Sequence, residues 1–223
     1  MKRHCLALAI FAAVVTAAHA SRSGLNNIPN ADTSAAGTGV VQAYSAFGED
    51  RKPSILSGVR WGFAPFGEKL EVGFDTRWKP GKSVPIFFNA KWVASRWDRS
   101  LPSFAIGVAS LAPGSQDRSR LGQPQTYGVF TYDAGFARLH AGYAAQHRNN
   151  AMFFGLDRSW VLGGRKLLFR ADVIEIQGAG QWLGSAGFTF KFTEALGIEL
   201  WQSKPTERGK AYTTFKLGYS FRR

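Results

Sequence analysis

The chain has 223 residues, with 28 Lys and Arg against 15 Asp and Glu, which gives a formal net charge of +13. Apolar residues make up 45% and aromatic residues 14% of the chain, so a natively disordered protein of low hydrophobicity is excluded. The single cysteine is Cys5, which excludes a disulfide scaffold, a cysteine-ligated zinc site and thiol catalysis in the rest of the chain.

Residues 1–20 have the pattern of a secretory signal peptide. Lys2 and Arg3 form a positively charged start, an apolar stretch covers residues 5–15, and the small-x-small sequence at residues 18–20 is a cleavage site. The apolar stretch is too short for a transmembrane helix, which needs about twenty residues. We therefore expect the protein to be exported and cleaved near residue 20.

Apolar and polar residues alternate through the remaining chain, as in β-strands that have one apolar and one polar face. In residues 68–79, for example, Leu70 and Phe74 share one face, whereas Glu71 and Asp75 share the other. Turns rich in glycine and proline separate the alternating runs. We predict twelve strands, at residues 39–47, 54–64, 68–79, 84–94, 103–112, 126–133, 136–145, 151–160, 166–175, 181–192, 195–203 and 210–221.

Two architectures use such strands, a soluble β-sandwich and a closed antiparallel transmembrane β-barrel. The predicted strands average about ten residues, which suits a tilted strand that crosses a bilayer. We therefore predict an all-β transmembrane barrel over residues 39–223, preceded by a periplasmic segment over residues 21–38. Twelve strands return both ends of the barrel to the periplasmic side. Ten strands are the alternative, because the connection at 95–102 is too long for an inner turn.

Aromatic residues near the strand ends are expected to form the girdles that mark the two membrane interfaces. The predicted girdle residues are Trp61, Trp78, Trp92, Trp160, Trp182, Trp201, Tyr219 and Phe221.

The polar face of the strands is expected to line the lumen. The predicted lumen residues are Arg60, Glu71, Asp75, Arg77, Lys91, Arg138, His140, Asp157, Arg170, Asp172, Lys191, Glu199 and Lys216. Their small excess of positive charge favours a passive pore for small anionic or sugar-like solutes. Because a barrel of about twelve strands is narrower than a sixteen-stranded porin, an ion-paired interior that only stabilises the barrel is an equal alternative.

An enzyme is the third possibility, since a membrane-embedded lipid hydrolase needs a histidine beside a nucleophile. His140 and His147 are the histidines after the leader, and Ser110 and Ser159 are possible partners, but no spacing singles them out. We therefore predict no catalytic residue, no metal site and no cofactor.

The basic residues are scattered, which argues against a nucleic-acid partner. Several lie in the predicted outer connections, where they could attract lipopolysaccharide headgroups: Arg51, Lys52, Lys82, Arg118, Arg120, Arg148, Lys204, Arg208 and Lys210.

Residues 39–223 resemble bacterial outer-membrane β-barrel proteins in general. The sequence Leu217-Gly218-Tyr219-Ser220-Phe221 resembles the C-terminal signal read by the barrel-assembly machinery, although two arginines follow it. Residues 24–32, Gly-Leu-Asn-Asn-Ile-Pro-Asn-Ala-Asp, resemble the start of YjbH-like barrels. These resemblances imply the outer membrane of a Gram-negative-type bacterium and an accessory role in exopolysaccharide secretion as a further possible function.

Overall fold

The computed structural model describes residues 24–49, 55–78, 86–94, 101–111, 125–146, 150–176, 181–207 and 209–222. The predicted leader and His147 lie outside these residues. Besides the short 3-10 turn η1 (Pro65–Gly67), the described residues form twelve strands. The strands are β1 (Thr38–Phe47), β2 (Ile55–Phe63), β3 (Lys69–Trp78), β4 (Ile86–Val93), β5 (Ser103–Leu111), β6 (Gln125–Asp133), β7 (Arg138–Gln146), β8 (Asn150–Leu162), β9 (Arg165–Ile176), β10 (Gln181–Lys191), β11 (Leu196–Pro205) and β12 (Tyr212–Arg222).

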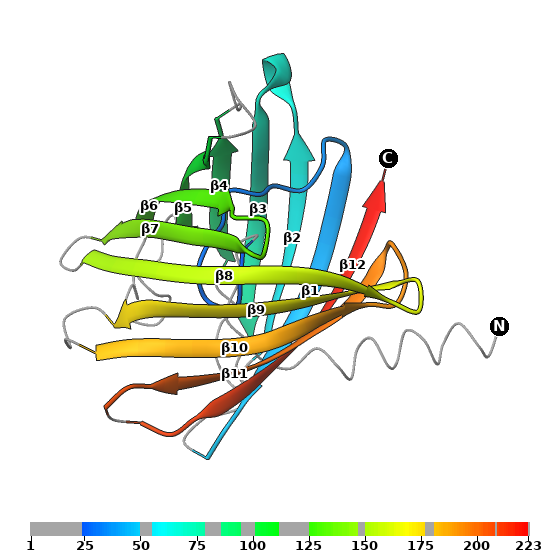
Figure 1. Cartoon of the computed structure of the whole chain (residues 1–223). Coiled ribbons are helices and arrows are strands. Elements are labelled where there is room, and N and C mark those ends of the chain that lie inside the picture. The colour runs from blue at the N-terminus through cyan, green and yellow to red at the C-terminus, as the bar shows by residue number, and fades with distance from the viewer. Residues whose placement is uncertain are drawn as a thin grey trace.

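The strands form one closed antiparallel barrel in which each strand pairs with its neighbours in sequence, and β12 pairs with β1 (Figure 1). The closing pair runs in register from Thr38 opposite Arg222 to Phe47 opposite Thr213. β4 and β5 pair directly, so no further strand lies between them in the barrel. The prediction of a twelve-stranded barrel is confirmed, and the ten-stranded alternative is wrong. Among the described residues, no helix has the length and apolar character needed to span a bilayer.

Two tight glycine turns lie at the end of the barrel where β1 begins. Gly163 and Gly164, between β8 and β9, have φ angles of 56° and 72°, which are the positive values that a two-residue hairpin turn of this hand requires. In the β6–β7 turn, Gly135 has a φ of 80°, and its amide donates a hydrogen bond of 3.0 Å to the Asp133 side chain. Glycine at these positions therefore fixes the register of both hairpins.

The outer face of the barrel is apolar and exposed, whereas the inner face is polar and buried. Phe74, Phe188 and Leu200 project outward and are about half exposed. Asp75 follows Phe74 and Thr189 follows Phe188 in the chain. Both of these polar side chains point inward and are buried. An apolar surface of this extent needs an apolar environment, which agrees with a barrel in a bilayer and not with a water-soluble sandwich.

The closed ring of strand pairs predicts a heat-dependent shift on a denaturing gel. We expect the unheated protein, purified in detergent, to migrate as a compact folded species and the boiled protein to migrate as an unfolded chain. The reason is that a closed sheet has no free edge at which detergent can begin to separate strands. Identical migration before and after heating, together with solubility in the absence of detergent, would contradict the barrel.

Candidate functional site in the barrel interior

Residues 24–37 lie inside the barrel, and we call them the lumen segment. In Figure 1 this dark-blue stretch runs across the inside of β2 and β3 before it enters β1. The Gly37 amide donates a hydrogen bond of 3.0 Å to the Gly62 carbonyl of β2, so the segment enters at the end of the barrel where β1 begins. Within the predicted periplasmic segment at residues 21–38, residues 24–37 thus lie inside the barrel, which the periodicity did not predict.

The deepest part of the lumen segment is an apolar turn. The Leu25 amide donates a hydrogen bond of 2.9 Å to the Ile28 carbonyl, and both side chains are 2% exposed. They pack in one cluster with small inner-wall residues such as Ala105 and Ala144. A Cβ atom at Gly155 of β8 would lie 2.3 Å from the Leu25 side chain. Small residues on the inner wall therefore leave the space that the turn fills.

Asp172 of β9 binds this turn through two successive backbone amides. The amides of Asn26 and Asn27 donate hydrogen bonds of 2.8 Å and 3.1 Å to one carboxylate oxygen of Asp172. The Asn27 side chain also donates hydrogen bonds to the hydroxyls of Ser185 and Ser203. Asp172 is 3% exposed, so the lumen segment provides hydrogen bonds that a buried carboxylate needs.

Arg138, the first residue of β7, forms a second anchor. Its Nε and Nη2 atoms donate hydrogen bonds of 2.9 Å and 2.6 Å to the two carboxylate oxygens of Asp157 on β8. Its Nη1 atom donates to both carboxylate oxygens of Asp32, at 3.1 Å and 2.8 Å. The guanidinium is therefore held rigidly by the wall on one edge and bound to the lumen segment on the other.

Lys91 and Glu71 hold the middle of the lumen segment. The Lys91 ammonium donates a hydrogen bond of 3.1 Å to the Asn30 carbonyl. The amide and hydroxyl of Ser34 donate hydrogen bonds of 2.7 Å and 2.8 Å to Glu71. Charged wall residues therefore contact the segment along its length, and all these contacts are non-covalent.

The other half of the interior is filled by side chains of the wall. The Glu199 carboxylate of β11 forms ion pairs with Arg170 at 2.7 Å and with Lys216 at 2.9 Å. The Lys216 ammonium lies 5.8 Å from the centre of the Tyr44 ring, and this ring lies 6.4 Å from the ring of Trp201. The barrel interior therefore holds both the lumen segment and this ion-paired cluster.

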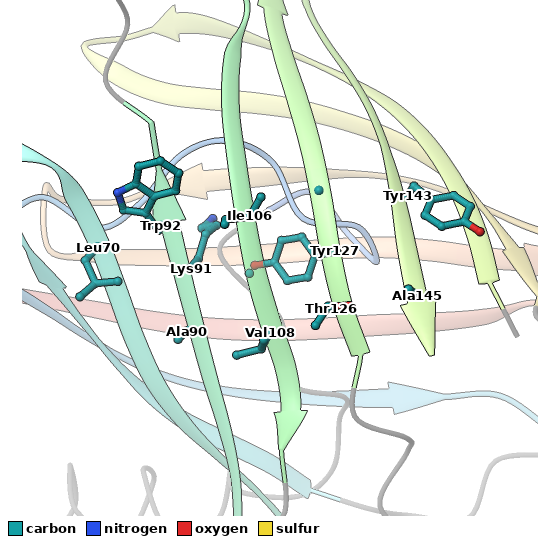
Figure 2. A pocket seen from close by; sticks show the side chains of 12 residues that line it. Leu70, Ala90, Lys91, Trp92, Ile106, Val108, Thr126, Tyr127, Tyr143 and Ala145 are labelled. Carbon is teal, nitrogen blue, oxygen red and sulfur yellow. The ribbon is translucent and has the colours of Figure 1, made fainter. Parts of the chain in front are cut away.

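A separate groove of about 560 Å³ lies on the outer face over β3 to β7. Figure 2 shows Trp92 and Tyr143 on opposite sides of it. The register places Trp92 opposite Ile106, Ile106 opposite Gly128, and Gly128 opposite Tyr143. The missing side chain at Gly128 helps to form the depression. The groove is an apolar indentation of the outer wall and is distinct from the charged interior.

Comparison with known protein families and with curated protein sequences finds no match. Solved structures do match the fold. KdgM porin, described in complex with disordered oligogalacturonate, superposes with a TM-score of 0.56 at 9% identity, over 83% of this chain and 99% of that one. NanC porin gives a TM-score of 0.52 at 7% identity, over 83% and 100%. The translocator domain of the autotransporter NalP from Neisseria meningitidis gives 0.52 at 9% identity, over 83% and 88%. The fold is that of outer-membrane β-barrels.

The inner wall of this outer-membrane barrel fold carries the charged residues that the alternation placed there. Eight of them are buried: Arg60, Glu71, Asp75, Lys91, His140, Asp157, Asp172 and Lys216. Arg77, Arg138, Arg170 and Glu199 are partly exposed on the same face, and Lys191 is exposed at the end of β10. Sequence reasoning missed the groups that bind the lumen segment through neutral side chains, namely Thr131, Ser185 and Ser203.

Seven of the eight predicted girdle aromatics lie on the outward face, and Trp201 does not. Trp201 is 4% exposed and packs inside the barrel against Tyr44 and Leu56. Its place in the girdle was a wrong prediction, because Trp201 lies two residues from Glu199 and therefore shares its face of β11. The other girdle residues include pairs in contact, such as Trp61 and Phe221 with ring centres 5.6 Å apart.

His140 belongs to a buried network on the inner wall. Its Nε2 atom lies 3.2 Å from Asp157 and its Nδ1 atom lies 2.9 Å from the Thr131 hydroxyl. That hydroxyl also accepts a hydrogen bond of 2.9 Å from the Ala31 amide of the lumen segment. Ser159 lies exposed towards the end of β8, and the two ring nitrogens of His140 are taken up by Asp157 and Thr131. Among the described residues, no group of three or more His, Cys, Asp or Glu side chains could hold a metal ion.

Proposed function

We propose that the protein is an outer-membrane channel for small anionic or sugar-like solutes, closed in this state by the lumen segment. The observation that carries the proposal is that a non-covalently bound chain segment occupies the interior beside β5 to β8, where Leu25 and Ile28 pack in one cluster with wall side chains such as Phe153. The wall there includes small residues that leave room for the segment, such as Ala105, Ala109 and Gly155. A barrel that served only as an anchor could fill this space with larger side chains.

The chemistry of the interior supports the solute class. The predicted lumen residues include seven cationic and five anionic groups, and Arg138 already binds the carboxylate of Asp32. Lys91 binds a carbonyl oxygen of the chain, as it could bind a polar group of a solute. The oligogalacturonate in the KdgM porin complex is consistent with a barrel of this fold admitting acidic sugars.

The location supported best is the outer membrane of a Gram-negative-type bacterium. Export would depend on the leader at residues 1–20, and insertion on the barrel-assembly machinery, which would read the aromatic alternation at Tyr219 and Phe221. Both side chains are on the outward face of β12. Lys204 is exposed at the opposite end of the barrel from the β1 start, where lipopolysaccharide headgroups could attract it. Lys210 lies at the same end and pairs with Glu49.

Deletion of residues 24–36 tests the channel directly. We expect the full-length mature chain to show little conductance in a planar bilayer, and the deletion variant to show stable single-channel steps. Gly37 remains, so the hydrogen bond to Gly62 that leads into β1 is retained. A deletion variant that is folded, as judged by its heat-dependent gel shift, but does not conduct would contradict the proposal.

The same deletion variant reports selectivity. Replacing Lys91 by glutamate should move the reversal potential in a salt gradient towards cation preference, because a buried lumen charge has changed sign. The matched control is Lys204→Glu, an exposed position on the outward face of β11, which should leave the reversal potential nearly unchanged.

An accessory role in exopolysaccharide secretion is the second candidate. The observation in its favour is that residues 24–32, which carry the YjbH-like resemblance, are the ones bound by Asp172, Lys91 and Arg138. This role predicts no conductance for the deletion variant and loss of surface polysaccharide in cells that lack the protein.

We also propose that the protein is not an enzyme. His140 is 3% exposed and faces the interior, whereas a lipid hydrolase must bring its base to the membrane. His140→Ala is therefore expected to leave the lipid composition of the outer membrane unchanged.

A further inference from the structure

The pairing of Arg138 with Asp32 resembles a binding site occupied by the protein's own carboxylate. The Nε and Nη2 atoms of Arg138 donate hydrogen bonds to Asp157 of the wall. These two hydrogen bonds set the orientation of the guanidinium. The Nη1 atom is presented to Asp32 and binds both of its oxygens. A guanidinium held in this way is prepared to bind a carboxylate of any origin.

The exposure of the two partners makes exchange possible. The Asp32 side chain is 45% exposed and that of Arg138 is 34% exposed, whereas the Asp157 side chain is 3% exposed. A dissolved carboxylate can therefore reach the outer edge of the guanidinium without disturbing its pairing with Asp157. Solvent-exposed ion pairs are weak and exchange partners readily.

The position of this pair connects it with the closure of the lumen. Arg138 begins β7, and odd-numbered strands begin at the end of the barrel where β1 starts. From that mouth the chain passes inward through Asp32, then Asn30, to the buried turn at Leu25 and Ile28. Asp32 is thus the charged side chain of the lumen segment on the mouth side of the buried turn.

We propose that Arg138 is a recognition site for the carboxylate of an acidic sugar, and that Asp32 is its resident occupant. A solute carboxylate replaces Asp32 on the Nη1 atom of Arg138 and loosens the lumen segment, so the solute opens its own channel. This inference rests on the proposed function, because it identifies what would release the segment. No bond is made or broken; one anion exchanges for another on a fixed cation.

The release can be measured through a thiol on the lumen segment. The only cysteine of the sequence lies in the leader, so Ala31→Cys gives the mature chain a single thiol at a position that is 5% exposed. We expect glucuronate to raise the rate of maleimide labelling in detergent in a saturable manner. Glucose, and sodium chloride at the same ionic strength, should not raise the rate.

Direct binding is measured by calorimetry on variants without the added thiol. Asp32→Asn should bind glucuronate about tenfold more tightly than the parent chain, because a tethered competing carboxylate has been removed. Arg138→Gln should not bind glucuronate. Ala36→Ser is the matched control, since it changes an exposed position of the same segment and should bind glucuronate within about twofold of the parent chain.

Two outcomes would overturn the inference. One is an equal labelling response to glucuronate and sodium chloride, which would reduce the effect to charge screening. The other is unchanged glucuronate affinity in Asp32→Asn, provided that its heat-dependent gel shift shows a folded barrel. Because both measurements are made in detergent, they are independent of conductance. A chain that binds glucuronate through Arg138 but never conducts would disprove the channel and leave the carboxylate site in place.

Discussion

Replacing Glu199 by glutamine is expected to destabilise the barrel by about 3–5 kcal/mol, the cost of leaving buried charges without their partner. Glu199 is the carboxylate between Arg170 and Lys216, at 2.7 Å and 2.9 Å. Glutamine keeps the shape of the side chain but leaves the two cations to repel each other inside the barrel. The measurement is the free energy of unfolding by denaturant in lipid vesicles.

Glu194→Gln is the matched control for this prediction. Glu194 is exposed in the turn between β10 and β11, where the same chemical change should alter the free energy of unfolding by less than about 0.5 kcal/mol. Equal stability of the two variants would mean that Arg170 and Lys216 are neutralised by other groups or by water, and that Glu199 is not the centre of the cluster.

Replacing both Leu25 and Ile28 by alanine is expected to release the lumen segment while the barrel stays folded. Each side chain is 2% exposed, and truncating a buried side chain of this size costs about 2–5 kcal/mol. Both truncations weaken the binding of the segment to the inner wall and not the wall itself, because neither residue belongs to a strand of the barrel. Hydrogen exchange at the amides of Asn26 and Asn27, which bind Asp172, should accelerate strongly.

The control for this second prediction is Ala36→Ser, at an exposed position of the same segment. It should leave the exchange of both amides unchanged. Continued protection of these amides in the double alanine variant would show that the polar anchors hold the segment without its apolar turn.

The alternation of side chains was sufficient to predict the wall of the barrel and which residues face inward. Two residues along a strand always share a face, so the inward position of Asp75 follows from that of Glu71. The same rule predicts that Trp201 faces inward, because Trp201 lies two residues from Glu199 on the same strand. The error arose from giving more weight to the position of tryptophan near a strand end than to its face.

The position of the lumen segment could not be predicted from periodicity. It has no regular secondary structure over most of its length, and Asp172 holds it through backbone amides, which every residue except proline possesses. Its partners Ser185 and Ser203 are small neutral residues on a polar face, and nothing distinguishes them from an ordinary lumen lining. One signal was available: Leu25 and Ile28 are apolar residues in a segment that was expected to lie in water.

The strands are of unequal length, and this has a consequence for the surrounding lipid. β4 has eight residues and β5 has nine, whereas β8 has thirteen and β9 has twelve. At about 3.3 Å per residue and a tilt near 45°, the short side spans roughly 20 Å and the long side roughly 30 Å. Over the residues that the structure describes, the sheet is therefore shorter beside β4 and β5 than beside β8 and β9. The bilayer is expected to thin beside β4 and β5, or the barrel to lean towards them, and either response favours a membrane thinner than average.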